Sequence, residues 1–266
     1  MIKTVDINPK IKIACKFIGE PSSSEYLVVF LHEGMGCIER FKAFPEKMCE
    51  KLGLPGLVFD RYGYGYSTAL QEERPVDYLH TEAEKSFPLL LEKLSLNNKK
   101  LILIGHSDGA SIALIYAALF PEKVKALISI AAHVFVEEIS CIGARELEKK
   151  YFNSESMRRK LRAYHFDHTE STLLAFTRTI PSEAFASFNI EGLLSSITAP
   201  VFVIQGKDDH YGTEKQVQSI ISHTKNPLNK FLFIEKCGHS PHITHTEFMV
   251  SECDAYIKTV LSKQIA

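Results

Sequence analysis

The sequence lacks an excess of charge, a long apolar run and a dense basic cluster. Its 266 residues carry a formal net charge of −1, and Lys and Arg are scattered along the chain. The most basic stretch, residues 158–162, has a helical pattern and is typical of a solvated helix face rather than of a nucleic-acid footprint. No apolar run approaches the length that crosses a membrane, and residues 1–6 lack the layout of a signal peptide. We therefore expect neither a nucleic-acid nor a membrane partner.

The cysteines also lack any paired motif. There are six of them, and none forms a C-x-x-C pair. Isolated cysteines usually serve as small core residues, and the cytosol keeps such thiols reduced. The sequence therefore predicts a cytoplasmic protein with free thiols. With 45% hydrophobic and 24% charged residues, the chain is long enough for one large domain or a core with an insertion.

Short apolar segments alternate with amphipathic segments of helical length. Continuous apolar runs, such as residues 26–31 and 100–104, are typical of strands that are covered on both faces. Their alternation with helices predicts an α/β fold, a mainly parallel open sheet of about eight strands with flanking helices. The expected strands are residues 11–17, 26–31, 56–59, 100–104, 126–130, 201–204 and 231–234, and the expected helices are 39–51, 79–94, 108–120, 214–222 and 246–261.

Residues 134–199 interrupt this alternation, because they contain no buried-strand pattern. Helical candidates lie near residues 143–152, 154–165, 170–180 and 182–197. In open α/β sheets, ligands bind beyond the carboxyl ends of the strands. We expect residues 134–199 to form a helical cap over that edge, and residues 1–133 and 200–266 to form the core. The alternative is a second lobe that packs elsewhere for stability.

The sequence Gly105-His106-Ser107-Asp108-Gly109 follows an expected strand and precedes an expected helix. Strand, G-x-S-x-G and helix is the setting of a nucleophile elbow, in which the serine hydroxyl projects from a strained turn. The positions two before and two after the serine must then be nearly free of side chains, and both are glycine. The alternative is a glycine-rich β–α turn with an incidental serine.

Candidate acids and a candidate base follow two later strands. Asp208 and Asp209 come after the strand 201–204, and His239 comes after the strand 231–234. Because the carboxyl ends of parallel strands meet at one edge, these side chains are expected near Ser107. A serine hydroxyl becomes a competent nucleophile only with such a base and an orienting acid.

Five motifs in this order resemble the α/β-hydrolase fold family over essentially the whole chain. They are His32-Glu33-Gly34-Met35-Gly36, the loop from Asp60 to Ser67, the serine elbow, the turn from Gly206 to Asp209, and Gly238-His239-Ser240-Pro241. The resemblance implies Ser107 as nucleophile, Asp209 as acid and His239 as base. It further implies that the backbone amides of Gly34 and Asp108 form an oxyanion hole, and that no cofactor is required.

The chain departs from the family pattern at Glu33, where the family usually has glycine. A carboxylate there either favours a cationic or hydroxylated substrate group, positions a water, or turns away to bond nearby backbone. We expect Glu33, Met35, His106 and His133 as possible pocket residues.

His239, His242 and His245 suggest a metal site by their spacing. Pro241 disfavours the unbroken helix that such a site would need, so no metal is expected.

These patterns predict a serine hydrolase that cleaves a small-to-medium carboxylic ester or lactone through an acyl-enzyme. Amide hydrolysis (including that of acyl-homoserine lactones) and carbon–carbon bond hydrolysis would use the same triad. A small-molecule receptor that keeps a slow triad is an alternative of another class. The sequence leaves the substrate's acyl length and the oligomeric state open.

Overall fold

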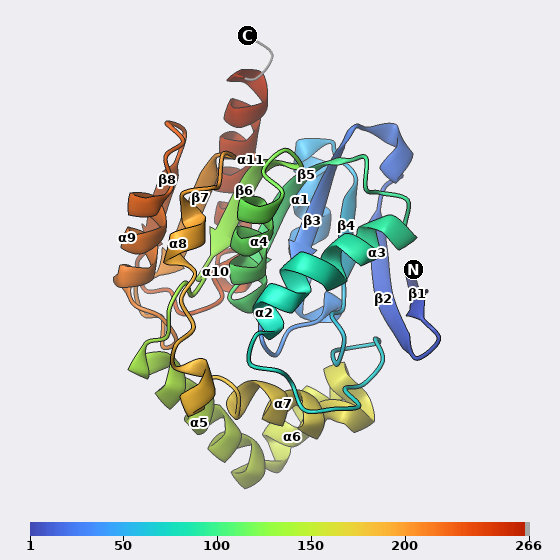
Figure 1. The fold of residues 1–266 in the computed structure, drawn as a ribbon, viewed down its shortest axis with the longest axis vertical. Coiled ribbons are helices and arrows are strands. Elements are labelled where there is room, and N and C mark those ends of the chain that lie inside the picture. Colours follow the sequence, from blue (N-terminus) through green and yellow to red (C-terminus); the bar gives the residue numbers. More distant parts are fainter. Residues whose placement is uncertain (264–266) are drawn as a thin grey trace.

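Eight strands form one sheet in the order β1-β2-β4-β3-β5-β6-β7-β8 in the computed structural model, which describes residues 1–263 (Figure 1). Strands β3 to β8 are mutually parallel, whereas β1 and β2 are antiparallel additions at one edge. The predicted mainly parallel open sheet with flanking helices is therefore confirmed. The strands are β1 (Ile2–Asn8), β2 (Ile11–Ile18), β3 (Tyr26–Leu31), β4 (Gly56–Phe59), β5 (Lys100–His106), β6 (Val124–Ile130), β7 (Val201–Gly206) and β8 (Lys230–Ile234).

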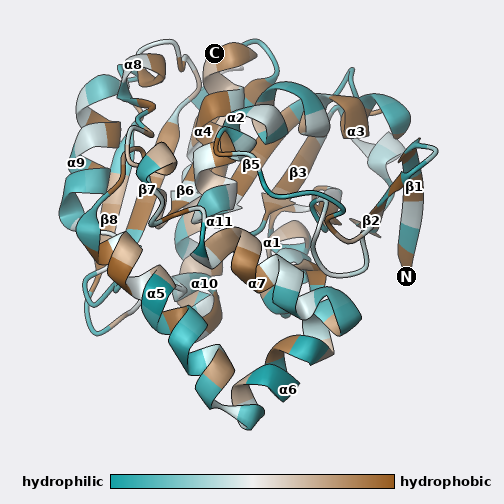
Figure 2. Ribbon diagram, turned by 60° about the horizontal axis from the view of Figure 1, so that its bottom comes forward, coloured by the Kyte–Doolittle hydropathy of each residue, from teal (hydrophilic) through white to brown (hydrophobic). Residues whose placement is uncertain are grey.

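The central strands are apolar throughout because both faces of the sheet are covered. Leu27 and Val29 of β3 belong to one hydrophobic cluster, and their neighbours Val28 and Phe30 belong to the other. In Figure 2 the central strands are mainly brown, whereas much of the outer helical surface is teal. The sequence pattern did not reveal β1, which is half-exposed at the sheet edge.

Helices cover the two faces of the sheet in separate groups (Figure 1). The helix α4, which follows the expected nucleophile, lies with α2, α3, α8 and α9 on one face, and α1 and α11 pack together on the other. Among residues 1–263, no helix is long and apolar enough to cross a bilayer. These helices are α1 (Phe44–Leu52), α2 (Tyr78–Thr81), α3 (Phe87–Lys93), α4 (Asp108–Leu119), α8 (Glu191–Leu194), α9 (Glu214–His223), α10 (Pro241–Thr244) and α11 (Thr246–Lys263).

Two expected helices are interrupted. The helix expected over residues 39–51 starts as a 3-10 turn, Ile38–Phe41, before α1. The helix expected over residues 79–94 contains a π-helical turn, Glu82–Ser86, between α2 and α3. In both cases the helical pattern is present, but the regular α-helical hydrogen bonding is not continuous.

Three helices lie beyond the carboxyl ends of the parallel strands, at the bottom of Figure 1. They are α5 (Glu138–Asn153), α6 (Glu155–His165) and α7 (Thr169–Thr177), and we call them the cap helices. The helix expected over residues 182–197 is instead a 3-10 turn, Glu183–Phe185, followed by the short α8. Since α8 packs against α4 and α9 on the face of the sheet, the last part of the expected insertion lies on the core. The domain boundaries remain a prediction.

Candidate active site

Ser107 occupies a sharp turn between β5 and α4. Its backbone has φ 52° and ψ −120°, a conformation that is strained for a residue with a side chain. A Cβ at Gly105 would collide with the backbone of Gly109 and Ala110, and a Cβ at Gly109 would collide with the Leu31 carbonyl. The flanking glycines are therefore required by close packing of backbone on both sides of the serine.

Asp209 and His239 meet at the carboxyl ends of β7 and β8. The His239 Nδ1 lies 2.9 Å from each carboxylate oxygen of Asp209. Asp209 is 8% exposed, and it also accepts a hydrogen bond from the Tyr211 backbone N–H at 2.8 Å. Burial opposes ionisation of Asp209, but the charge and hydrogen bond of His239 outweigh it and hold its pKa below the ordinary value. Asp208, by contrast, is exposed, so Asp209 is the carboxylate that bonds to the ring.

Ser107 and His239 line the same two cavities. Among residues 1–263, no hydrogen bond joins the Ser107 hydroxyl to the His239 ring. Such bonds are often long without a bound substrate and tighten when one is present. The expected nucleophile and the expected base therefore face the same cavities.

The two expected oxyanion donors differ in how they are held. The Asp108 N–H belongs to the first residue of α4 and has no acceptor within the helix. Gly34 lies in the loop after β3, and the buried His32 side chain stabilises this loop. His32 accepts a hydrogen bond from the Arg61 N–H at 3.0 Å and contacts the Glu33 carbonyl through Nδ1 at 2.8 Å. Gly34 also lines a cavity that reaches Ser107.

The side chain of Asp108 is directed into the core. Its Oδ2 accepts a hydrogen bond from the Tyr78 hydroxyl at 2.9 Å and contacts the buried Arg61 guanidinium at 3.5 Å. Its Oδ1 lies 3.7 Å from His133 Nε2. Asp108 is fully buried, so its carboxylate supports the turn from below. The sequence pattern gave no sign of the role of Arg61.

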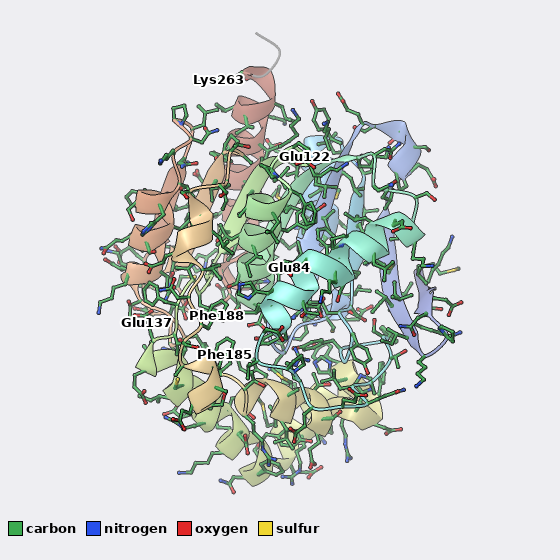
Figure 3. All side chains as sticks on the ribbon, in the orientation of Figure 1. Glu84, Glu122, Glu137, Phe185, Phe188 and Lys263 are labelled. Carbon is green, nitrogen blue, oxygen red and sulfur yellow. The ribbon has the colours of Figure 1, made fainter. Side chains whose placement is uncertain are left out.

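The first cavity beside Ser107 is lined mainly by apolar side chains. Its volume is about 20 Å³. The stacked rings of Phe185 and Phe188, labelled in Figure 3, have centroids 4.9 Å apart, and Phe188 also packs against His133. The residues lining this cavity are Ser107, Ala131, Ala132, His133, Phe135, Val136, Ser140, Phe176, Ile180, Phe185, Tyr211, Gly212 and His239.

The second cavity, of about 170 Å³, lies on the Gly34 side of Ser107 and is lined by two charged side chains. These are Glu33 and Arg40, from the loop after β3 and the 3-10 turn that follows it. The other lining residues are Gly34, Met35, Ser107, Leu147, Met157, Leu161, Phe176, Tyr211, His239 and Ser240. The cap helices supply the apolar wall through Leu147, Met157, Leu161 and Phe176.

Three of the four expected pocket residues line these cavities. Glu33 and Met35 line the charged cavity, and His133 lines the apolar one. The expectation for His106 needs correction, because His106 is fully buried and lines neither cavity. It lies underneath, with its Nε2 2.8 Å from the His239 carbonyl oxygen. Its position at the end of β5, on the strand rather than on the turn, directs it into the core.

Glu33 bonds to side chains rather than to backbone. Its Oε1 accepts a hydrogen bond from Arg40 Nε at 3.0 Å, and its Oε2 lies 3.4 Å from His106 Nδ1. Burial disfavours the charged form, but the His106 hydrogen bond and the Arg40 charge hold the pKa of Glu33 well below its usual range. Sequence reasoning missed Arg40 as a site residue, since nothing in its local pattern sets it apart from other residues at a helix start.

The histidines that suggested a metal site make different contacts. His242 is buried, with its ring centroid 4.5 Å from that of His106, whereas His239 bonds to Asp209. In the part of the chain that the structure describes, no group of three or more His, Cys, Asp or Glu side chains is arranged to hold a metal ion.

The sequence of the chain is similar to those of several known hydrolases. The family model for the alpha/beta hydrolase fold matches residues 26–146. The serine hydrolase BPHL of Mus musculus is 29% identical over 175 residues, which are 64% of this chain and 58% of that protein. The proline iminopeptidase of Lactobacillus delbrueckii subsp. bulgaricus is 30% identical over 115 residues, which are 43% of this chain and 38% of that protein. The chain thus matches less than two thirds of the length of these relatives.

Solved structures share the fold over nearly the whole chain. MGS-M2, an alpha/beta hydrolase enzyme from a Medee basin deep-sea metagenome library, has a TM-score of 0.76 at 17% identity, covering 96% of this chain and 97% of that chain. The enol-lactonase from Burkholderia xenovorans LB400 has a TM-score of 0.74 at 12% identity, covering 96% and 99%. At these identities the likeness concerns the fold.

Proposed function

Because this chain belongs to the α/β-hydrolase fold superfamily, we propose that it is a serine hydrolase that acts on a small-to-medium carboxylic ester or lactone. Ser107 is the nucleophile, His239 the general base and acid, and Asp209 the residue that orients the ring. The amides of Gly34 and Asp108 form the oxyanion hole. The observation that carries the proposal is the His239 ring bonded to a buried carboxylate beside a serine in a strained turn.

The reaction follows from these roles. His239 Nε2 takes the proton of the Ser107 hydroxyl as the oxygen attacks the substrate carbonyl, and it later returns that proton to the leaving group. Asp209 holds a proton on Nδ1, which leaves Nε2 free to accept, and stabilises the imidazolium that forms. The two amides bind the oxyanion of the tetrahedral intermediate, at about 3–4 kcal/mol per donor. Water then hydrolyses the acyl-enzyme by the same steps.

The relatives support hydrolysis without selecting the bond. One is named a proline iminopeptidase and one structural neighbour an enol-lactonase. The small cavity beside Ser107, of about 20 Å³, is lined mainly by apolar side chains, which favours an uncharged apolar group against this wall of the site. We propose ester or lactone cleavage on this basis, in the cytoplasm, where the six free cysteines would remain reduced.

The test is hydrolysis of short p-nitrophenyl esters and of matched lactones and amides by the wild type and by Ser107→Ala. We expect multiple turnovers by the wild type, and a loss of kcat by about 10³-fold or more in Ser107→Ala, since the attacking oxygen is gone. The variant should keep the wild-type circular dichroism and melting temperature. Undiminished turnover in Ser107→Ala would contradict the nucleophile, and a single slow turnover by the wild type would favour a ligand receptor over an enzyme.

A further inference from the structure

The cavity on the Gly34 side of Ser107 contains a charged pair that the triad does not require. Leu147, Met157 and Leu161 give it an apolar wall, yet Glu33 and Arg40 also line it. Charged side chains are seldom buried beside apolar ones unless they are paired or bind a ligand. Glu33 is 14% exposed and Arg40 is 29% exposed, so the arginine is the more accessible partner.

Glu33 has little capacity left for a substrate cation. One of its oxygens accepts from Arg40 Nε, and the other faces His106 Nδ1. His106 Nε2 lies 2.8 Å from the His239 carbonyl oxygen, which holds the ring beside Glu33. A substrate amine would therefore have to displace a side chain that already contacts the carboxylate.

Arg40, in contrast, has free donors. Its Nε is fixed by Glu33, and its guanidinium lies 5.6 Å from the centre of the Tyr164 ring. Lys42 donates to the Tyr164 hydroxyl at 2.7 Å and adds a second cation next to this ring. Among residues 1–263, the two terminal nitrogens of Arg40 have no hydrogen-bond acceptor. A guanidinium fixed through Nε presents the planar pair of donors that matches a carboxylate.

We propose that Arg40 is a specificity-determining residue that binds a carboxylate of the substrate, so that the preferred substrates are esters or lactones of acids with a second, ionised carboxyl group. The carboxylate occupies the charged cavity, which Gly34 and Ser107 also line. This inference rests on the proposed hydrolase function, because it assigns the substrate class of the same site.

The experiment compares three p-nitrophenyl esters of similar length: the adipate monoester, the heptanoate and the 6-aminohexanoate. We expect the wild type to favour the adipate monoester in kcat/KM. Arg40→Gln should lower kcat/KM for that ester by about 10- to 100-fold more than it lowers the heptanoate value, which is the range of a charged hydrogen bond. Arg40→Lys, which keeps the charge but loses the planar fork, should fall between the two.

Arg145→Gln is the matched control, because it removes one positive charge from an exposed site on a cap helix. Its ratio of adipate to heptanoate activity should equal that of the wild type. Hydrolysis that depends on Ser107 but shows no preference for the adipate monoester, or prefers the amine, overturns the inference and leaves the hydrolase function intact. So does an equal loss for all three esters in Arg40→Gln.

If no ester is cleaved, the proposed hydrolase function fails, and a binding measurement then tests the role of Arg40 by itself. Calorimetry with monomethyl adipate compares Ser107→Ala with the double variant Ser107→Ala/Arg40→Gln. We expect the double variant to bind at least about tenfold more weakly. Equal affinities, or no binding to Ser107→Ala, overturn the assignment of Arg40.

Discussion

The sheet edge that carries Ser107 and the cap helices that lie over it hold the site by different means. At the sheet edge, backbone packs on backbone: Gly105 and Gly109 leave no room for a Cβ against the neighbouring main chain. The cap helices contact the site through side chains. The Phe176 ring of α7 lies over Gly34, and His165 at the end of α6 bonds to the Met35 carbonyl in the loop after β3.

The contrast has a physical consequence. Backbone atoms fixed by a sheet on both sides cannot move without breaking strand hydrogen bonds, whereas a ring or an imidazole can change rotamer. We therefore expect substitutions at the sheet edge to lower activity strongly, because the backbone there cannot move to restore the geometry of the site. Substitutions at the cap contacts should have smaller effects that a second substitution or a change of pH can modify.

The largest effect is expected at Asp209, the proposed acid of the triad. Asp209→Asn should lower kcat by about 10³-fold or more, because an amide cannot hold the His239 tautomer that leaves Nε2 free to accept a proton. Asp208→Asn is the adjacent control, and since Asp208 is exposed, its kcat should stay within about threefold of the wild type. Steady-state kinetics on one ester checks both variants. A larger loss in Asp208→Asn would exchange the roles of the two residues.

A smaller effect is expected from His165, which joins a cap helix to two core loops. Its Nδ1 accepts from the Gly65 N–H and its Nε2 contacts the Met35 carbonyl, each at 3.1 Å. These bonds require the neutral ring, and burial lowers the pKa of His165 to about 4. As the pH falls, His165 is protonated in the unfolded chain before it is protonated in the folded protein. Its contribution to the free energy of unfolding is therefore fully present above about pH 6.5, and about 3 kcal/mol of it is lost as the pH drops towards 4.

Urea unfolding between pH 8 and pH 4 checks this effect. His165→Gln should be less stable than the wild type at pH 8 and lose less stability on acidification, because one of the buried histidines no longer titrates. His210→Gln, at an exposed position, should follow the wild-type curve. Parallel curves for the wild type and His165→Gln would show that this histidine does not couple the cap helices to pH.

The same contrast explains what the sequence predicts well. The strands and the glycines around Ser107 follow from local rules: apolar runs for covered strands, and residues without side chains where two backbones meet. Because parallel strands end at one edge, the sequence also indicates that Ser107, Asp209 and His239 lie together. These features depend on the backbone path, which the pattern of apolar residues largely determines.

Features that depend on side-chain contacts between distant segments are not predictable in this way. Arg40 becomes a candidate ligand only because Glu33 fixes its Nε and the cap helices close the cavity around it. His106 precedes the nucleophile in sequence, yet its ring bonds to the His239 carbonyl beneath the site. β1 escaped notice because its apolar residues, Ile2, Val5 and Ile7, form neither a continuous run nor a regular alternation. The helix expected over residues 182–197 fails because the chain there crosses from the cap helices to the face of the sheet.

The smallest effect is expected where the two regions touch. A Cβ at Gly34 would overlap the Phe176 ring, so Gly34→Ala must displace either the ring or the loop after β3. We expect kcat/KM to fall by about tenfold, equivalent to about 1.4 kcal/mol of transition-state stabilisation. Phe176→Ala alone should have a weaker effect, and the double variant Gly34→Ala/Phe176→Ala should recover most of the activity lost in Gly34→Ala. A double-mutant cycle in kcat/KM measures this coupling. If the two losses simply add, the ring does not constrain Gly34, and the loop after β3 is held by the core alone through His32 and Arg61.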